Sequence, residues 1–274
     1  MALKKNRAFL KWAGGKYSLI EAITAKLPKA NKLIEPFVGA GSVFLNTQYP
    51  KYLLNDINPD LINLYKILQK RSDQYITDSA SLFVPANNDE ARYYALREKF
   101  NQSNDVYERA VIFLYLNRFG YNGLCRYNQK GIFNVPFGRY KAPYFPHKEI
   151  LFFAEKSQQA TFTCQSFEQV FTRARKGAVI YCDPPYAPIS ETAKFNSYSS
   201  GGFSISSQSL LAQLAEKTAF ERKIPVLISN HDTQFTREIY QEAQLTELQV
   251  NRFISQNGGT RNKVGELLAL YHLE

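Results

Sequence analysis

An α/β fold is predicted for this 274-residue chain: a sheet with helices on both faces, interrupted by a mainly helical insertion that carries a β-hairpin. Strand-like and helix-like segments alternate at the start of the chain and again from about residue 145, which is typical of βαβ units. Between about residues 57 and 144, helical segments follow one another without strands. We therefore expect residues 1–56 and 145–274 to form one domain and residues 57–144 to form the insertion.

Each element follows from its local pattern. Strands are expected at residues 33–37, 52–56, 161–164, 178–182, 225–229 and 267–271, where β-prone apolar residues cluster. Helices are expected from about residue 42, at 60–70, 89–100 and 105–118, and around Leu210, Leu211 and Leu214, which are expected to share one face. The apolar run in 105–118 predicts deep burial, and the glycine- and tyrosine-rich basic stretch at 120–140 predicts the hairpin.

Composition favours a polyanionic partner. Lys and Arg number 34 against 24 Asp and Glu, so the formal net charge is +10, which suits a polyanion or an anionic membrane surface. Tyr and Phe are abundant, and a basic surface rich in tyrosine stacks on bases and binds phosphates. A tyrosine-rich core would give the same composition.

Several classes are disfavoured. Three widely spaced cysteines predict neither a disulfide framework nor a zinc site, so we expect no metal and a reducing cytoplasm. The N-terminal residues carry Lys and Gly where a signal peptide needs an apolar core, and no run of about 18 apolar residues follows. Export and membrane association are therefore not expected.

A glycine turn follows the first expected strand, in the segment Glu35-Pro-Phe-Val-Gly-Ala-Gly-Ser42. A strand, a glycine turn and a helix start allow a ligand to approach the backbone closely, and Asp56 ends the next strand, where an acid can bind ribose hydroxyls. Phe44 stands where a dinucleotide-binding fingerprint requires its third glycine. The pattern therefore predicts nucleoside binding at Gly39 and Asp56 and disfavours hydride transfer.

The tetrad Asp183-Pro184-Pro185-Tyr186 directly follows the expected strand 178–182. Open α/β sheets place their chemistry at the carboxyl ends of strands, and two prolines fix the backbone there. The Asp183 carboxylate and the Pro184 carbonyl could both accept hydrogen bonds from an exocyclic amine, and Tyr186 could stack on an extruded base. A simple proline turn is the alternative, but the tetrad, its placement and the upstream glycine turn occur together.

These motifs resemble the DNA adenine methyltransferases of the Dam type, in which the cofactor motif precedes the DNA-recognition insertion and the insertion precedes D-P-P-Y. The resemblance covers nearly the whole chain, from residues 9–16 through 35–42 and 183–186 to 228–232. It implies a Rossmann-like S-adenosylmethionine-dependent methyltransferase sheet. It also implies base flipping and direct methyl transfer to the adenine amino nitrogen in GATC sites of duplex DNA, with S-adenosylhomocysteine as the product and no metal.

The resemblance also implies the roles of individual residues. Those expected at the cofactor are Trp12, Lys16, Phe37, Gly39, Asp56, Ser166, Phe167 and Asp183. Those expected to act in catalysis are Asp183, Pro184 and Tyr186.

The segment 120–128 is a turn that presents an aromatic ring, amides, an aliphatic side chain and an arginine, a set able to wedge a base step and read a guanine. A solvated basic hairpin is the alternative. The resemblance implies that Tyr121 and Asn122 act near the flipped base. Lys11 would read the first guanine. The remaining expected DNA contacts are Leu124, Arg126 and Pro136 at base edges, with Arg139 and Tyr140 as weaker candidates.

Other patterns carry less weight. The serine-rich stretch 197–209 is expected to be a mobile loop, and the turn at 257–263 is equally well a phosphate contact or a plain turn. Neighbouring His231 and Asp232 predict no catalytic triad, and His147 and His272 are expected at the surface.

Three alternatives share some of these features. An RNA or free-nucleobase amino-methyltransferase would not need the hairpin, and a DNA cytosine-amine methyltransferase usually has Ser where Asp183 stands. A catalytically silent DNA-binding regulator could lose the cofactor residues, which are all present. We expect a monomer that binds GATC-containing duplex DNA in the cytoplasm or nucleoid of a bacterium or in a phage-infected cell.

Overall fold

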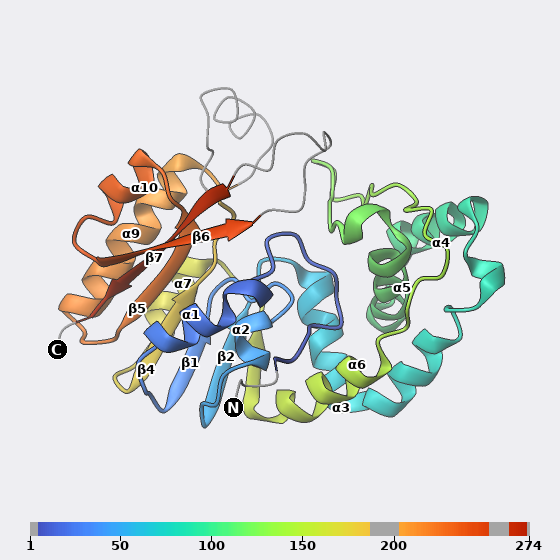
Figure 1. Ribbon diagram of the computed structural model, residues 1–274. Coiled ribbons are helices and arrows are strands. Elements are labelled where there is room, and N and C mark those ends of the chain that lie inside the picture. The colour runs from blue at the N-terminus through green and yellow to red at the C-terminus, as the bar shows by residue number, and fades with distance from the viewer. Residues whose placement is uncertain (1–4, 187–202, 252–262, 273–274) are drawn as a thin grey trace. The chain divides into compact units, whose positions relative to one another are not determined.

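The computed structural model describes residues 5–186, 203–251 and 263–272 (Figure 1). Residues 197–202 of the serine-rich stretch and nearly all of the turn 257–263 lie outside these residues. The chain divides into two compact units, which are described separately. The first unit consists of Met1–Thr24, Val38–Gln48 and Leu53–Cys164, and the second consists of Ala25–Phe37, Tyr49–Tyr52 and Gln165–Glu274.

Seven strands form one mixed sheet in the order β3-β2-β1-β4-β5-β7-β6, and helices flank it. The strands are β1 (Lys32–Glu35), β2 (Lys51–Asn55), β3 (Ala160–Thr163), β4 (Ala178–Cys182), β5 (Val226–His231), β6 (Gln244–Asn251) and β7 (Lys263–Tyr271). The α/β class and the flanking helices predicted from the sequence are confirmed. The strand β6 was not predicted.

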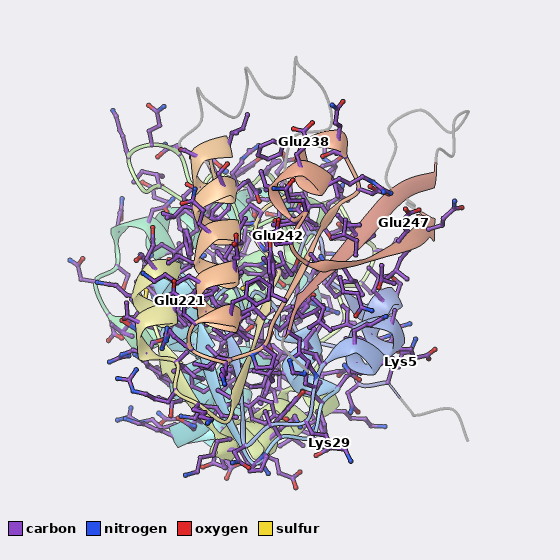
Figure 2. All side chains as sticks on the ribbon, turned by 90° about the vertical axis from the view of Figure 1, so that its left-hand side faces the viewer. Lys5, Lys29, Glu221, Glu238, Glu242 and Glu247 are labelled. Atoms are coloured by element: carbon purple, nitrogen blue, oxygen red, sulfur yellow. The ribbon has the colours of Figure 1, made fainter. Side chains whose placement is uncertain are left out.

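In the second unit, β4 lies between β1 and β5 and is parallel to both, while β7 is antiparallel to β5 and to β6. All five residues of β4 and all six of β5 are buried, as expected for central strands covered on both faces. The helices of this unit are α7 (Phe167–Arg173), α9 (Ile205–Phe220) and α10 (Gln234–Ile239). Glu221, Glu238 and Glu242 lie on its outside (Figure 2).

The first unit is mainly helical. Its longer helices are α3 (Pro59–Ala80), α4 (Glu90–Gln102), α5 (Val106–Phe119) and α6 (His147–Lys156). The shorter elements are α2 (Ser42–Leu45) and the 3₁₀ turns Tyr17–Leu19, Pro85–Asn87, Tyr121–Gly123 and Ser157–Gln159, while α1 (Ile20–Lys26) belongs to both units. Side chains of Asn58, Asp89 and Asp105 cap α3, α4 and α5 by accepting hydrogen bonds from backbone N–H groups of the first turn.

The structure corrects several sequence-based expectations. The helix expected at 60–70 continues to Ala80, across a kink at Arg71, and the helix expected from Ser42 is a single turn. The end of the expected loop 197–209 is helical, because Ser204 caps α9 by accepting a hydrogen bond from the Ser207 N–H group at 3.1 Å. On this helix Leu211 is buried and Leu210 is exposed, so the three leucines expected on one face do not share the same environment.

Tyrosine is largely a core residue in this protein. Eight of the tyrosines that the structure describes are less than 2% exposed, among them Tyr65, Tyr75, Tyr93 and Tyr115 in the first unit. The hydroxyl groups of these four tyrosines donate to backbone carbonyls, such as Tyr75 to Ala110 at 3.0 Å, so burial leaves these four donors satisfied. The tyrosine content therefore reflects the core at least as much as a base-binding surface.

Candidate functional site

The glycine turn of the first unit holds the Asp56 carboxylate. Oδ2 of Asp56 accepts a hydrogen bond from the Gly39 N–H group at 3.1 Å, and Oδ1 accepts one from the Asn58 N–H group at 3.0 Å. Gly39 has φ +47°, in the left-handed region that glycine adopts without strain. The structure thus brings together the glycine turn and the acid that the sequence pairs with it.

Burial governs the charge of this acid. Burial raises the pKa of Asp56 above its ordinary value of 3.8, and hydrogen bonds from the N–H groups of Asn58, Gly39 and Ile57 oppose this increase only in part. A buried carboxylate gains most from further donors, such as the hydroxyl groups of a ribose. The position and environment of Asp56 therefore fit a nucleoside ligand.

Trp12 and Lys16 lie in the same unit. A Cβ atom added to Gly39 would come within 2.9 Å of Trp12 Nε1, so the indole packs directly on the glycine turn. Lys16 is buried, and its Nζ donates to the Gly14 carbonyl at 2.9 Å. Tyr65 fixes the turn further by donating from its hydroxyl group to the Gly39 carbonyl at 2.5 Å.

The tetrad lies in the second unit, directly after β4. Asp183 is partly exposed and Pro184 is buried. The next carbonyl, of Pro185, accepts a hydrogen bond from Gln208 Nε2 of α9 at 2.7 Å. Gln208 Oε1 in turn accepts from Asn230 Nδ2 at 3.0 Å. Polar side chains from α9 and β5 therefore hold the proline turn in position.

Tyr186 is fixed at both ends of its side chain. Its hydroxyl group donates to Glu266 Oε1, which also accepts from Ser229 Oγ at 2.8 Å, and its ring meets the His231 ring edge-to-face at 4.2 Å. Burial, followed by the neighbouring Asp183 and Glu266 carboxylates, raises the pKa of Tyr186 far above its usual range. The side chain is therefore a neutral phenol that acts as a donor.

Two of the other expected cofactor residues of this unit, Phe37 and Phe167, lie in an aromatic cluster. Phe37 lies 5.6 Å from Phe167 and 5.5 Å from Phe203, and the last two rings are 5.4 Å apart. Ser166 caps α7 in a capping box with Gln169, so its side chain stabilises the start of this helix. Cofactor contact by Ser166 remains a prediction.

The hairpin at residues 120–140, called the recognition hairpin below, is held by two isolated antiparallel bridges, Gly120 with Phe137 and Tyr127 with Phe133. Backbone hydrogen bonds join the Tyr121 N–H group to the Pro136 carbonyl at 2.8 Å and the Asn134 N–H group to the Arg126 carbonyl at 3.1 Å. Helix α4 anchors this hairpin, because Asn101 and Arg97 donate to the carbonyls of Phe133 and Val135, both at 3.0 Å.

The tip of this hairpin exposes several predicted DNA-contacting side chains. Tyr121 is 43% exposed, and Asn122 follows in the left-handed conformation, with φ +53°. The Asn122 N–H group donates to the Tyr140 hydroxyl group at 2.8 Å, which fixes this unusual backbone. The other predicted contacts on the hairpin are partly or fully exposed, namely Leu124, Arg126, Pro136, Arg139 and Tyr140.

Both arginines among these predicted contacts already have partners within the protein. Arg126 donates to Asn134 Oδ1 at 2.8 Å, and Arg139 lies 3.3 Å from Glu90 in an exposed ion pair. An exposed ion pair contributes little stability, so Arg139 can leave Glu90 at low cost.

Lys11 joins the hairpin although it is more than 100 residues away in sequence. Its backbone N–H group donates to Asn117 Oδ1 at 2.9 Å, and its Nζ lies 4.0 Å from the centroid of the Tyr140 ring. The Lys11 side chain packs on Gly123, where an added Cβ would come within 2.1 Å of Lys11 Cβ. The structure thus brings Lys11 and Tyr140 together.

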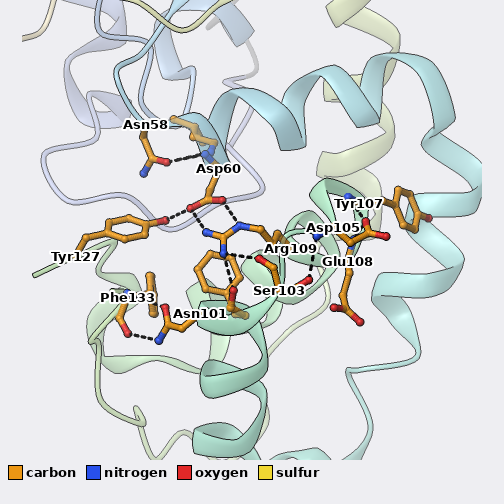
Figure 3. A network of polar contacts seen from close by, with 12 residues as sticks. Asn58, Asp60, Asn101, Ser103, Asp105, Tyr107, Glu108, Arg109, Tyr127 and Phe133 are labelled. Atoms are coloured by element: carbon orange, nitrogen blue, oxygen red, sulfur yellow. Dashed lines mark hydrogen bonds and ion pairs between the residues drawn. The ribbon is translucent and has the colours of Figure 1, made fainter. Parts of the chain in front are cut away.

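Sequence reasoning missed two sets of residues. Asp60, Arg109 and Tyr127 form a polar network (Figure 3), and Glu266 holds Tyr186. Both sets join residues at least 49 positions apart, so no local pattern reveals them. The clearest sequence signal was Glu266, an acid within the otherwise largely apolar segment that forms β7.

The other polar residues considered from the sequence are structural or exposed. Asp232 forms an ion pair with Arg237 at 2.6 Å, while His147 and His272 are exposed. Burial raises the pKa of the Cys182 thiol well above its usual range, so it is not a thiolate nucleophile. Within residues 5–186, 203–251 and 263–272, no helix has the length and apolar character needed to cross a membrane.

The seven-stranded mixed sheet with flanking helices defines the class as a Rossmann-like α/β fold, with the glycine turn and the tetrad following its strands. A family model for D12 class N6 adenine-specific DNA methyltransferases matches residues 12–254. The chain therefore belongs to this family and is an adenine-specific DNA methyltransferase. Membership implies S-adenosylmethionine as the methyl donor and DNA as the substrate.

Relatives match over almost their full length. The chain is 61% identical over 269 residues to the DNA adenine methylase of Vibrio cholerae O395, covering 98% of this chain and 97% of that protein. It is 60% identical to the DNA adenine methylase of Escherichia coli K12, covering 98% and 96%. Identity to the DNA adenine methylase of Serratia marcescens is 57%, covering 98% and 100%.

Proposed function

We propose that the protein methylates the amino nitrogen of adenine within GATC sites of duplex DNA, after rotating the adenine out of the helix. The observation that carries the proposal is the tetrad after β4, where a partly exposed Asp183 precedes a tyrosine fixed by Glu266 and His231. A carboxylate followed by a rigid aromatic ring suits an unpaired purine better than a base inside the duplex.

In this proposal the Asp183 carboxylate and the Pro184 carbonyl accept hydrogen bonds from the two amino hydrogens of the adenine. The lone pair of this nitrogen is delocalised into the ring, and two acceptors favour the pyramidal geometry that frees it. Such acceptors act mainly in the transition state, which is how they increase the rate. Tyr186 keeps the ring in place by stacking. Bound S-adenosylmethionine supplies the electrophilic methyl group.

The residues present fit S-adenosylmethionine. The half-buried Asp56 carboxylate suits the ribose hydroxyls, and the Trp12 indole and the close backbone at Gly39 suit an approaching nucleoside. Phe37 and Phe167 offer aromatic surface for the adenosyl group. Lys16, Ser166 and Asp183 complete the proposed set.

For DNA recognition we assign Tyr121 as the wedge between bases, with Asn122 beside the rotated adenine. Leu124, Arg126 and Pro136 read base edges in the second half of the site, and Lys11 reads the first guanine. Arg139 and Tyr140 complete the contact surface. The exposure of Tyr121, Asn122 and Arg126 and the proximity of Lys11 to Tyr140 support this assignment.

We assign DNA recognition to an insertion at residues 57–144 and the methyl transfer to residues 1–56 and 145–274. We further propose that the protein acts as a monomer, without a metal, in a bacterial cytoplasm or a phage-infected cell. The similarity to bacterial DNA adenine methylases supports the location.

Transfer of a labelled methyl group to two duplexes tests the proposal. One duplex contains GATC and the other GTTC, and nucleoside analysis of the product identifies the methylated base. We expect N6-methyladenine in the GATC duplex and about 5- to 150-fold less label in the GTTC duplex, since one wrong base pair costs about 1–3 kcal/mol. Label in cytosine, or equal labelling of the two duplexes, would contradict the proposal. Preferential labelling of RNA would favour a different substrate class.

A further inference from the structure

A short segment links the nucleoside-binding acid to the recognition hairpin within the first unit. It runs from Asp56 to Asp60. The Asp56 carboxylate accepts hydrogen bonds from Gly39 on one side and from Asn58 on the other. Asn58 Oδ1 in turn accepts from the Asp60 and Leu61 N–H groups at 3.0 and 3.2 Å. The backbone between the two acids is therefore held by successive hydrogen bonds and has little freedom to move independently.

Asp60 continues this chain of contacts across the unit (Figure 3). Its side chain is buried, and its two oxygens accept from Arg109 Nε and Nη2, both at 2.8 Å, in a bidentate ion pair. Oδ2 also accepts from the Tyr127 hydroxyl group at 2.7 Å. Arg109 is fixed in turn by the carbonyls of Phe100 and Ser103, at 2.6 and 3.2 Å. The Asp60 carboxylate therefore has one well-defined position.

Tyr127 carries the contact into the recognition hairpin. It pairs with Phe133 across the hairpin, and the two rings meet edge-to-face at 5.5 Å. Phe133 also contacts Phe100 of α4, and the Arg109 guanidinium packs over the Phe100 ring, with Cζ 4.1 Å from its centroid. The neighbouring Arg126 bonds to Asn134 on the opposite arm. A change in the position of Tyr127 therefore changes the arm that presents Arg126.

We propose that Asp60, acting through Arg109 and Tyr127, is a positioning residue that couples occupancy of the cofactor site at Asp56 to the order of the recognition hairpin. The inference rests on the proposed function, because it takes Asp56 as a cofactor residue and the hairpin as the DNA reader. A ligand that donates hydroxyl groups to Asp56 uses the same oxygens that hold the segment, so the constraint it places on Asp56 is passed through the stiff segment to Asp60 and Tyr127. The hairpin then has less freedom to lose when DNA binds, which makes the two ligands cooperative.

Tyr127→Phe tests this coupling with a minimal change. It removes one hydroxyl group and leaves both the ring packing and the Arg109–Asp60 ion pair. Tyr107→Phe is a matched control, because Tyr107 also donates to a carboxylate of α3, Asp78 Oδ2 at 2.6 Å, but near the opposite end of the helix. Both variants are made in the full chain, and thermal unfolding checks that each is folded.

The coupling is measured as the ratio of the dissociation constants for a GATC duplex without and with S-adenosylhomocysteine, which binds without turnover. We expect a ratio of at least about 5 in the wild-type protein and in Tyr107→Phe. In Tyr127→Phe the ratio should fall at least about threefold, while the affinity for S-adenosylhomocysteine without DNA stays within about twofold of wild type. A wild-type ratio in Tyr127→Phe, or a ratio of one in the wild-type protein, would overturn the inference.

Hydrogen–deuterium exchange provides a second readout, and its measurement on the wild-type protein does not depend on whether the variant folds. S-adenosylhomocysteine should protect backbone amides at residues 124–136 in the wild-type protein without DNA, and Tyr127→Phe should lose this protection. Absence of protection in the wild-type protein would contradict the inference. Methyl transfer to GATC in the same preparation separates the two proposals. If the protein methylates GATC but shows no coupling, the proposed function holds and the inference fails. If it does not methylate GATC, both fail.

Discussion

The Asp56 carboxylate shows how much of a site one residue determines. Its position is set by two backbone donors, Gly39 and Asn58, and burial raises its pKa. The position was predictable, because an acid at the end of the second strand is a recognisable pattern. The pKa shift was not predictable, since it depends on side chains that cover Asp56 from distant parts of the sequence.

Cofactor affinity should therefore weaken in mildly acidic solution. As pH falls through the raised pKa of Asp56, the carboxylate becomes protonated and accepts hydrogen bonds from ribose hydroxyls less well. The decrease should begin at a higher pH than an exposed aspartate would give. Because a raised carboxyl pKa favours protonation of the folded state, the contribution of Asp56 to stability is lost as pH rises through that value, in the opposite direction to affinity.

Calorimetric titration of S-adenosylhomocysteine between about pH 8 and pH 4 measures this dependence. The variant Asp56→Asn is the control: its affinity should be about tenfold lower at neutral pH and should lack the acidic decrease. A wild-type affinity that parallels that of Asp56→Asn across the whole range would contradict the role of Asp56.

At the scale of elements, local patterns predicted the central strands and the helices of the insertion more precisely than their ends. The residues of β4 were predicted exactly because they form a continuous apolar run between turn signals. The extension of α3 to Ala80 was missed, because the stretch after Lys70 is polar and its helix is interrupted at Arg71. The strand β6 was missed because its pairing with β7 is a tertiary feature.

The recognition hairpin depends on close contact between two elements distant in sequence. Gly123→Ala places a Cβ within 2.1 Å of Lys11 Cβ, whereas Gly131→Ala in the same hairpin meets no heavy atom within 4 Å. Both glycines have positive φ, at +62° and +73°, so the backbone cost of about 1–2 kcal/mol is common to both. Gly123→Ala should therefore lower the unfolding free energy by about 1–3 kcal/mol more than Gly131→Ala.

Urea denaturation and binding of a GATC duplex measure the two glycine variants. DNA affinity should fall at least about tenfold in Gly123→Ala, because Lys11 is displaced, and less than about threefold in Gly131→Ala. Equal losses in the two variants would show that the Lys11 contact does not set the shape of the hairpin.

At the scale of the whole molecule, the fold class and the order of the motifs followed from the sequence, while the residues that support the site did not. Glu266 and Tyr186 are 80 positions apart, and only the folded sheet brings β7 to the tetrad. The excess of tyrosine indicated a base-binding surface more strongly than the buried tyrosines warrant. Net charge, by contrast, depends on no fold and remains a direct prediction about partners.

The formal net charge of +10 predicts a strong salt dependence of DNA binding. Cationic groups that contact phosphates release counterions, so the logarithm of the association constant should fall with the logarithm of salt concentration, with a slope of about −3 or steeper. Fluorescence anisotropy with a GATC duplex across a salt series measures the slope, and S-adenosylhomocysteine binding in the same series is the control. A flat DNA titration would contradict electrostatic binding.

Single-turnover methyl transfer by Asp183→Ala tests the central claim, that this carboxylate accepts hydrogens of the adenine amino group. Asp232→Ala is the control, because Asp232 also directly follows a buried parallel strand, β5, but is paired with Arg237. At saturating S-adenosylmethionine, Asp183→Ala should bind a GATC duplex within about threefold of wild type and transfer methyl groups at least about 10³-fold more slowly. Asp232→Ala should remain active. Transfer by Asp183→Ala within about tenfold of the wild-type rate would contradict the account.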